Sequence, residues 1–424
     1  MPRLNPAELE IDLFCKGVRL DGSCTLEQDA RSFSRTRAGL GDGLEMVVES
    51  PEKRIWLNAP VFEGFAQGSP YLLKKEDGRY AVLHEADREI YPVSLPPAPA
   101  WYGRKTSRGT DMTHIGVLQG TYLGIYLGNT CAFWDGDTKL NCKFCTTGLN
   151  VGKHEVLEKS VEDVVEVARA AKAESGITFV HFNSGWQRGR GLNIAAPYVK
   201  ALKEQAGVFV GLQAIPAPRE RFAKYDWLID CGVDHFSFCY ELHNPKYFAD
   251  ICPGKEKFIT QQLFFDAMEY TSRKLGKGRV SGEIIAGIEP IEDTLRAVEY
   301  ITSIGAFPTV CIFRPVPGAD MESSPSPAYE DMRRIFAHVY ACMRKNGIPM
   351  GIIPNIEVSL VVNPDDTKFL APRDAAWHWY DLKLKALKIL AKPIVTKQLR
   401  PRPIAADAAR SPLAEENAPA AGAA

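Results

Sequence analysis

Residues 208–240 read VFVGLQAIPAPRERFAKYDWLIDCGVDHFSFCY, and this stretch decides the fold. The apolar runs at 208–214 and 234–240 have the length and composition of strands, and the segment 219–232 between them has that of a helix. A strand, a helix and a second strand in succession predict a parallel pair with a crossover connection.

The same alternation extends in both directions from this unit. Further strands are expected at 121–127, 177–182, 279–287 and 308–313, and further helices at 160–175, 197–207, 261–276 and 294–305. Ser160 and Asp163 form an expected capping pair at the start of the first helix. The fold class is therefore predicted as α/β: a partial or complete TIM-like (β/α) barrel of about six parallel strands, with a small β-rich N-terminal domain.

Four regions are expected along the chain. Residues 1–110 carry short apolar runs broken by turn residues, with EDGR at 76–79 as a hairpin turn, and form the β-rich N-terminal domain. Residues 111–325 form the barrel. Residues 326–395 pack on it as a helix at 326–346, short strands within 348–362 and an amphipathic helix from about Asp374 to Ala391. Residues 396–424 are rich in Ala and Pro, which predicts a disordered tail.

Composition excludes several classes of partner. The 424 residues include 51 Lys and Arg against 52 Asp and Glu, so no basic excess points to nucleic acid. No apolar run approaches the ~20 residues that span a bilayer, and MPRLNPAELEIDLF lacks a signal pattern. We expect a cytoplasmic protein without nucleic-acid or membrane partners.

The segment 128–148, GNTCAFWDGDTKLNCKFCTTG, holds three of the ten cysteines. Cys131, Cys142 and Cys145 have the spacing C-x10-C-x2-C, and thiolates are soft ligands suited to iron–sulfur clusters and zinc. A cubane cluster with three protein thiolates leaves one iron open to a small molecule. The loop also follows the first expected barrel strand, and sites in such folds lie at the carboxyl ends of strands.

Two other interpretations of the loop stay open. With His154 as a fourth ligand it becomes a structural zinc site in a non-redox barrel protein. An electron-transfer or scaffold protein typically needs four thiolates, so a distant cysteine would have to join the three.

A three-cysteine loop after the first strand of a partial barrel, with the aromatic Phe144 before the last cysteine, resembles the radical S-adenosylmethionine (SAM) superfamily. The usual spacing there is C-x3-C-x2-C, and the longer first gap resembles a biotin-synthase-like group found near nitrilase-type genes. Matching stretches are GSPYLL, SVEDVVEVARAA, PGK at 253–255 and IIAGIE. The resemblance covers most of residues 60–320.

The resemblance implies a radical SAM enzyme with a [4Fe–4S] cluster on Cys131, Cys142 and Cys145. SAM would be cleaved to a 5′-deoxyadenosyl radical, which abstracts hydrogen from a small-molecule substrate. Rearrangement, bond cleavage, methylation or ring formation would follow, so the enzyme is a lyase, transferase or mutase. Electrons would come from a reductant such as flavodoxin or ferredoxin.

The resemblance also implies SAM-binding residues. Phe144 would lie near the adenine, the turn of Asn183, Ser184 and Gly185 would hold the amino group through backbone carbonyls, and Gly287 and Ile288 would pack on the adenine.

Three further candidates follow from position and residue type. Gln213 ends a strand and would contact substrate or SAM. Glu241 follows the next strand and would accept hydrogen bonds from ribose hydroxyls. Arg314 follows the last strand and would clamp a carboxylate or phosphate. Glu283, a charged residue on a barrel strand that needs a partner, is a modest candidate for substrate binding.

Overall fold

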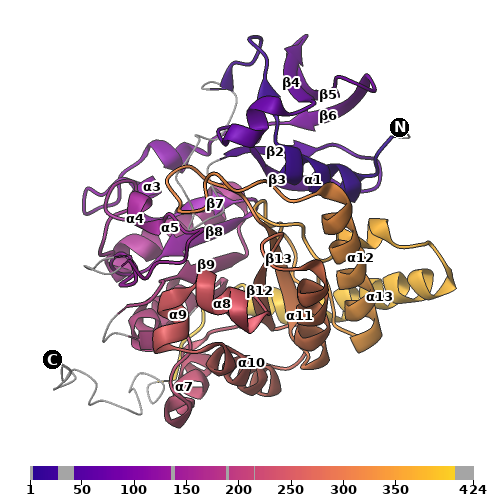
Figure 1. Ribbon diagram of the computed structural model, residues 1–424. Coiled ribbons are helices and arrows are strands. Elements are labelled where there is room, and N and C mark those ends of the chain that lie inside the picture. The colour runs from indigo at the N-terminus through magenta and orange to yellow at the C-terminus, as the bar shows by residue number, and fades with distance from the viewer. Residues whose placement is uncertain (1–2, 27–42, 135–138, 188–190, 214, 406–424) are drawn as a thin grey trace.

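The computed structural model describes residues 3–26, 43–134, 139–187, 191–213 and 215–405. They form two sheets, with the N-terminal one above the central one in Figure 1. The N-terminal sheet has the order β1-β4-β5-β6-β2-β3. Its strands are Arg19–Leu20 (β1), Gly43–Val48 (β2), Ile55–Pro60 (β3), Tyr71–Glu76 (β4), Arg79–His84 (β5) and Glu89–Ser94 (β6).

The EDGR hairpin turn is confirmed. Glu76 pairs with Arg79 across antiparallel β4 and β5, and Asp77 and Gly78 between them have φ of 49° and 75°. Positive φ at both central residues fits the right-handed twist of the two strands. A helix that we did not predict, α1 (Pro6–Lys16), packs on β3.

The central sheet has seven strands in the order β13-β12-β11-β10-β9-β8-β7. They are Val117–Gln119 (β7), Tyr122–Tyr126 (β8), Phe179–Asn183 (β9), Phe209–Gln213 (β10), His235–Glu241 (β11), Val280–Ala286 (β12) and Phe307–Ile312 (β13). The six expected strands β8 to β13 are all parallel and lie in sequence order.

Two points of the barrel prediction need correction. β7 adds a seventh, antiparallel strand beside β8, because the intervening turn at Gly120 (φ 74°) is too short for a crossover. The sheet is also open, since β13 and β7 are its two edges and do not pair. The sheet is therefore a curled, mostly parallel half-barrel rather than a closed barrel.

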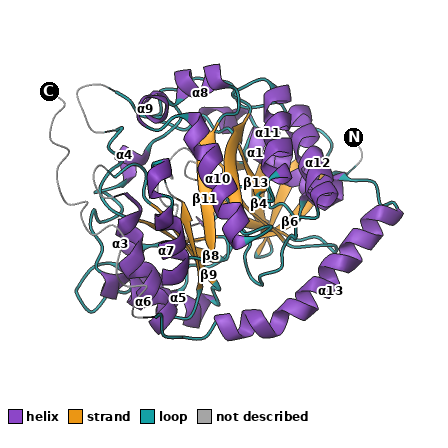
Figure 2. Cartoon of the chain, turned by 90° about the horizontal axis from the view of Figure 1, so that it is seen from below, coloured by secondary structure: helices purple, strands orange, loops and turns teal. Residues whose placement is uncertain are grey.

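Helices cover the outer face of this sheet (Figures 1 and 2). The described ones are Met112–Ile115 (α3), Thr147–Asn150 (α4), Val161–Ser175 (α5), Ala196–Gln205 (α6), Ala223–Cys231 (α7), Pro245–Ile251 (α8), Pro253–Phe258 (α9), Gln261–Leu275 (α10), Ile291–Ser303 (α11), Tyr329–Asn346 (α12) and Ala375–Gln398 (α13). The predicted cap of α5 is confirmed, because the Ser160 side chain accepts a hydrogen bond from the Asp163 amide at 3.0 Å. None of these helices is long and apolar enough to cross a bilayer.

The strands expected within 348–362 are absent, and this prediction was wrong. Two prolines interrupt the segment, which runs as irregular chain between the two sheets. The Asn58 amide donates to the Ser359 carbonyl at 2.6 Å, and the Thr121 amide donates to the Glu357 carbonyl at 3.0 Å. Strand residues must pair along a ladder, whereas these residues bond to β3 and to the β7–β8 turn.

The tail prediction also needs correction at its start. Helix α13 continues to Gln398, and the chain after it packs back under α5 and α6. The Lys172 ammonium donates to the Leu399 carbonyl at 2.8 Å, and the Arg402 amide donates to the Lys203 carbonyl at 3.0 Å. These contacts order residues up to 405, and the rest of the predicted tail lies outside the described residues.

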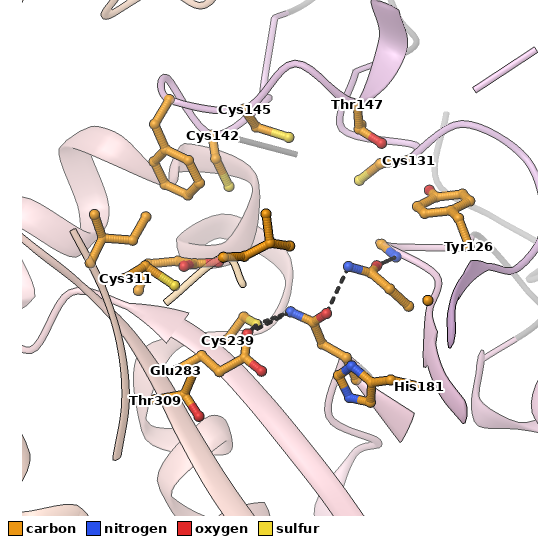
Figure 3. Close-up of a pocket in the computed structure, with 18 of the residues that line it drawn as sticks. Tyr126, Cys131, Cys142, Cys145, Thr147, His181, Cys239, Glu283, Thr309 and Cys311 are labelled. Atoms are coloured by element: carbon orange, nitrogen blue, oxygen red, sulfur yellow. Dashed lines mark hydrogen bonds between the residues drawn. The ribbon is translucent and has the colours of Figure 1, made fainter. Parts of the chain in front are cut away.

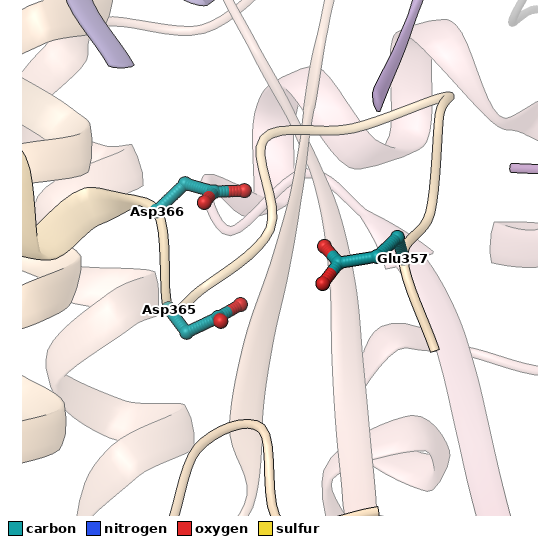
Figure 4. Close-up of side chains that lie close together, drawn as sticks. All are labelled: Glu357, Asp365 and Asp366. Carbon is teal, nitrogen blue, oxygen red and sulfur yellow. The ribbon is translucent and has the colours of Figure 1, made fainter. Parts of the chain in front are cut away.

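A cluster of buried carboxylates joins the N-terminal sheet to the irregular segment (Figure 4). Lys53, just before β3, places its ammonium 3.1 Å from Glu357 Oε2, 2.9 Å from Asp365 Oδ2 and 2.7 Å from Asp366 Oδ1. Glu10 of α1 is fully buried, and neither of its oxygens has a hydrogen-bond partner among the described residues. Lys53 is therefore the cation of a cluster whose acids outnumber it.

This excess of acid makes stability depend on pH. Burial, and then the charge of Asp365, raise the pKa of Asp366 to about 7, and burial raises the pKa of Glu10. An acid whose folded pKa exceeds its unfolded value binds more protons when folded. Its contribution is thus favourable below the unfolded pKa and is lost as pH rises towards 7.

We predict that Asp366→Asn flattens this dependence. In the wild-type protein the free energy of unfolding should fall between about pH 4 and pH 7, by on the order of a few kcal/mol. Urea unfolding at a series of pH values measures it, with the exposed Asp331→Asn as a matched control. An unchanged pH slope in Asp366→Asn would show that this carboxyl is not the titrating group.

Candidate active site

A cavity of about 250 Å³ lies at the carboxyl ends of the central strands. Cys131, Cys142 and Cys145 line one end of it, and Figure 3 shows Cys239, Glu283, Thr309 and His181 across from them. The irregular segment adds apolar wall residues, namely Val358, Leu360 and Val361. The cavity is thus bounded by a thiol end, a polar strand end and a loop from the C-terminal region.

The cysteine loop is held against the α8–α9 segment by main-chain contacts. The Lys143 amide donates to the Ile251 carbonyl at 2.9 Å, and the Gly254 amide donates to the Leu140 carbonyl at 3.1 Å. A Cβ on Gly254 would lie 2.5 Å from that same carbonyl oxygen, so only glycine allows the approach. The first residues of α9 therefore set the position of the loop.

A second glycine allows Cys131 to approach the end of β9. Gly185 has φ of 54°, and a Cβ there would lie 2.9 Å from the Cys131 Cβ and 3.0 Å from the Tyr126 hydroxyl. The next residue, Trp186, donates its amide to the Cys131 sulfur at 3.3 Å. A backbone donor aimed at sulfur favours the thiolate, which is the form that binds metal.

The surroundings of the three thiols differ. Burial raises the pKa values of Cys131 and Cys145. The pKa of Cys142 is lowered by a hydrogen bond from the Cys252 thiol and by the nearby charge of Lys255. Metal binding must therefore displace the protons of Cys131 and Cys145, so metal affinity should fall as pH falls.

A buried cation lies beside the thiols. Lys255 of α9 donates to Glu241 Oε1 and to the Cys239 carbonyl, each at 2.6 Å. Burial opposes its charge, but Glu241 and Cys142 outweigh burial and raise the pKa of Lys255. Glu241 reaches it from a bulge at the end of β11, with φ of 69°. Such strain at a strand end persists only where the surroundings hold it.

Three aromatic rings stack beside the cysteine loop. Phe133 and Trp186 are 4.4 Å apart at 25°, and Trp186 and Phe258 are 5.0 Å apart at 26°. Phe133, Trp134, Phe144 and Trp186 line the cavity. Flat faces of this kind suit a planar base or ring, and they exclude water from the thiol end.

The far end of the cavity is a hydrogen-bonded polar group on adjacent strands. Asn183 donates to Gln213 Oε1 at 2.7 Å, Gln213 donates to Glu283 Oε2 at 2.9 Å, and the Cys239 thiol lies 2.6 Å from the same carboxyl oxygen. Ser237 bonds the other oxygen. Burial raises the pKa of Glu283, which forms no ion pair within the described part of the chain.

His181, two residues before Asn183 on β9, also faces this end. Burial lowers its pKa to about 4, so the ring is neutral near pH 7. Its Nε2 is buried and has no hydrogen-bond partner among the described residues. A neutral imidazole with one open nitrogen can receive or donate one hydrogen bond to a bound molecule.

The structure gathers most of the predicted site residues around this cavity. Lining it are Cys131, Cys142, Cys145, Phe144, Asn183, Gly185, Gln213 and Glu241. The cavity-lining residues do not include Ser184, Gly287, Ile288 or Arg314. The carbonyl of Ser184, expected to bind SAM, instead accepts a hydrogen bond from Gln187 Nε2 at 2.5 Å.

Gly287 and Arg314 are used elsewhere. A Cβ on Gly287 would lie 2.3 Å from Pro327 Cγ, so this glycine fits a tight turn rather than a flat adenine. Arg314 is buried and donates to the Asn58 carbonyl at 2.6 Å, with Glu63 3.5 Å away. It ties β13 to the N-terminal sheet, so the expected anion clamp does not fit its position.

Sequence reasoning underrated three groups. Lys255 follows Cys252 in CPGK, but nothing local marks it as the cation beside Cys142. Cys239 lies on the same strand as Glu241 and lines the cavity, although a lone cysteine on an apolar strand is ordinarily a core residue. His181 and Asn183 are two residues apart on β9, so their side chains lie on the same face of the strand. This spacing is the sequence signal that could have identified His181.

No protein-family model matches the chain. The bacteriochlorophyllide c C-7(1)-hydroxylase of Chlorobaculum limnaeum is 24% identical in an alignment 322 residues long, which covers 68% of this chain and 78% of that protein.

Solved structures give weaker likenesses. The radical SAM methyltransferase from Sphaerobacter thermophilus has a TM-score of 0.40 at 14% identity, covering 66% of this chain and 76% of that one. Methylornithine synthase has 0.41 at 14%, covering 69% and 94%. The FeFe-hydrogenase maturase from Carboxydothermus hydrogenoformans has 0.41 at 16%, covering 53% and 50%.

We predict that Gly185→Ala lowers the iron content of the anaerobically reconstituted protein. The added methyl group meets Cys131 at 2.9 Å, and small shifts around metal ligands cost roughly tenfold or more in metal affinity. Gly191→Ala is the matched control, because Gly191 has a similar φ of 49° but open space around its Cβ position. Equal iron and sulfide in both variants would show that this close approach does not position the ligand.

Proposed function

We propose that this chain is a radical SAM enzyme, which catalyses reductive cleavage of SAM followed by hydrogen abstraction from a small-molecule substrate. The observation that carries the proposal is the convergence of Cys131, Cys142 and Cys145 on one end of a cavity, with a polar strand end opposite. When bound there, a [4Fe–4S] cluster with SAM supplies the 5′-deoxyadenosyl radical.

The donor set fits such a cluster. Three thiols face the cavity together, and the described residues around them include one buried cation, Lys255, that would offset the anionic charge of the ligands. His154, the fourth ligand expected for a zinc site, is exposed and does not line the cavity. The zinc alternative therefore lacks support from geometry.

Cys252 bears on the four-thiolate alternative. It is fully buried, hydrogen-bonds to Cys142, and is not among the residues that line the cavity. Two sulfurs in hydrogen-bond contact are closer than two ligands of different irons, so Cys252 fits a donor to the Cys142 thiolate. This arrangement supports a cluster with an open iron.

The walls of the cavity suit SAM and a substrate at opposite ends. Phe144 and Trp186 offer flat faces near the thiols, and the free oxygen of Glu241 can accept a hydrogen bond from a ribose hydroxyl. The aromatic wall and the loop at 358–361 would keep water away from a reactive intermediate. Hydrogen abstraction then takes place between these two ends.

Glu283 is the proposed substrate anchor. All of its described hydrogen-bond donors are neutral, so its carboxylate lacks a cation. A substrate ammonium would supply that cation and favour the ionised form of Glu283, and the Nε2 of His181 offers a second polar contact. We therefore infer an amine-bearing substrate attacked at a C–H bond. A hydroxylase relative, which by its name modifies a carbon position, supports C–H chemistry.

The first test is 5′-deoxyadenosine formation under anaerobic, reducing conditions. Wild type should form it, and Cys142→Ala should not, because one cluster ligand is lost. Cys252→Ser should keep its iron and its 5′-deoxyadenosine formation, since that residue is a donor and not a ligand. A colourless zinc protein without this product would refute the proposal, and loss of the cluster in Cys252→Ser would favour four thiolates.

The second test concerns Glu283→Gln. If a bound substrate increases 5′-deoxyadenosine formation, a panel of small primary amines and their uncharged isosteres should separate the two proteins. Wild type should respond to amines, more strongly as pH rises through the raised pKa of Glu283, while Glu283→Gln keeps its cluster but loses the response. Stimulation by uncharged isosteres in both proteins would exclude the ammonium contact.

A further inference from the structure

Helix α13 runs along the outer edge of the molecule (Figure 2) and is anchored by one face only. Tyr380 is buried and bonds to the Ile348 carbonyl, Trp377 donates to the Lys368 carbonyl at 3.1 Å, and Val395 is buried near the other end. Asp374 caps the helix by accepting from the Trp377 amide at 2.7 Å. These contacts hold the helix in place and leave its opposite face free.

The opposite face is apolar. Five large side chains on it are exposed: Trp379 (71%), Leu382 (57%), Ile389 (73%), Leu390 (71%) and Ile394 (63%). At 100° per residue their positions fall within a sector of about 140° of the helix surface, so they form one broad stripe along the helix. Half of the exposed large apolar side chains of the described chain thus lie on one helix, so they are clustered and not scattered over the surface.

Positive charge accompanies this stripe. The helix has the lysines 383, 385, 388, 392 and 397 against the single acid Asp381, whereas the whole chain has a net charge of −1. At 100° per residue, Lys385 and Lys392 border the stripe on one side, and Lys383 and Lys397 project from within it. Long lysine stems can lie along apolar surface while their ammonium groups reach outward.

We propose that this face of α13 lies in the interface of an anionic lipid bilayer and holds the protein on the membrane surface. An apolar stripe with an exposed tryptophan and flanking lysines combines the two terms of interfacial binding, which are buried apolar area and attraction to acidic headgroups. No spanning helix is needed, so this proposal replaces the expectation that no membrane partner exists, which rested on span length and on the lack of a signal pattern.

A second copy of this chain is the competing occupant. Pairing two such helices would bring two sets of lysines together, because each helix has five lysines and a single acid, Asp381, which pairs with Lys385. Like charges across an interface oppose association. Charge complementarity therefore favours acidic lipid. The proposal does not depend on the iron–sulfur chemistry, because binding is measured without turnover.

Sedimentation with lipid vesicles tests it. The full-length protein should bind vesicles of phosphatidylglycerol and phosphatidylcholine in equal parts, bind phosphatidylcholine alone more weakly, and release as salt rises. The double variant Ile389→Ser with Leu390→Ser should bind at least about tenfold more weakly, because two apolar anchors are lost. Lys383→Gln with Lys392→Gln should bind several-fold more weakly and with less salt dependence.

Controls keep the result specific. Ile90→Ser removes an apolar side chain of 56% exposure outside α13 and should leave vesicle binding unchanged. A blue shift of tryptophan emission on vesicles should disappear in Trp379→Phe, and circular dichroism checks that the variants keep their helices. Absence of binding, or equal binding by the Ser variant, overturns the proposal. So does a dimer in analytical ultracentrifugation that the Ser variant abolishes, which would assign the face to a second copy.

Discussion

The buried ammonium of Lys255 is the interaction on which the site depends. It joins the first turn of α9 to the bulged end of β11 through Glu241 and the Cys239 carbonyl, and its charge acts on Cys142. An ammonium buried without partners would cost several kcal/mol, roughly, so the partners are obligatory. The bulge gives Glu241 its positive φ, and the ion pair holds that strained position.

The Lys255–Glu241 ion pair also bears on how three cysteines can lie together in one buried loop. When the three cysteines bind metal as thiolates they repel one another in one buried place, and a resident cation reduces that repulsion. Gly254 of α9 and Gly185 after β9 let two different segments approach the loop closely. These glycines set the position of the cysteine loop, and Lys255 balances the charge of its thiolates. Different residues therefore meet the two requirements.

Sequence pattern predicted those parts of the fold that depend on residues close together in the sequence. The six parallel strands, their order and the cap of α5 follow from runs and turn residues that are contiguous in sequence. The helix α1 was missed although Asn5 and Glu8 form a capping box, with Pro6 at the first helical position, that could have been recognised. Whether the sheet closes depends on tertiary structure, because no local sequence pattern shows whether β13 pairs with the first strand.

The site shows the same division. Gln213 and Glu241, which end consecutive parallel strands, were predicted because topology alone brings strand ends together, whereas Asn183 was implied by the family resemblance. Arg314 also ends a strand, but its partner Asn58 is 256 residues away. The N-terminal sheet covers that end of β13, and no pattern around Arg314 indicates this. Prediction failed where a second unit packs over the first.

The N-terminal sheet also holds part of the cavity wall in place. Lys53 binds Glu357, and the residues that follow, Val358 to Val361, form part of the cavity wall. The Glu357 carbonyl is fixed in turn by the Thr121 amide next to β8. The wall is therefore held between the N-terminal sheet and the first parallel strand, and the segment has no strand pairing of its own to replace these contacts. Since the pKa of Asp366 beside Lys53 is raised to about 7, the rigidity of this wall is coupled to the protonation of that carboxyl. A half-barrel open at one edge needs such a wall, and here it is an ion-paired loop rather than another strand.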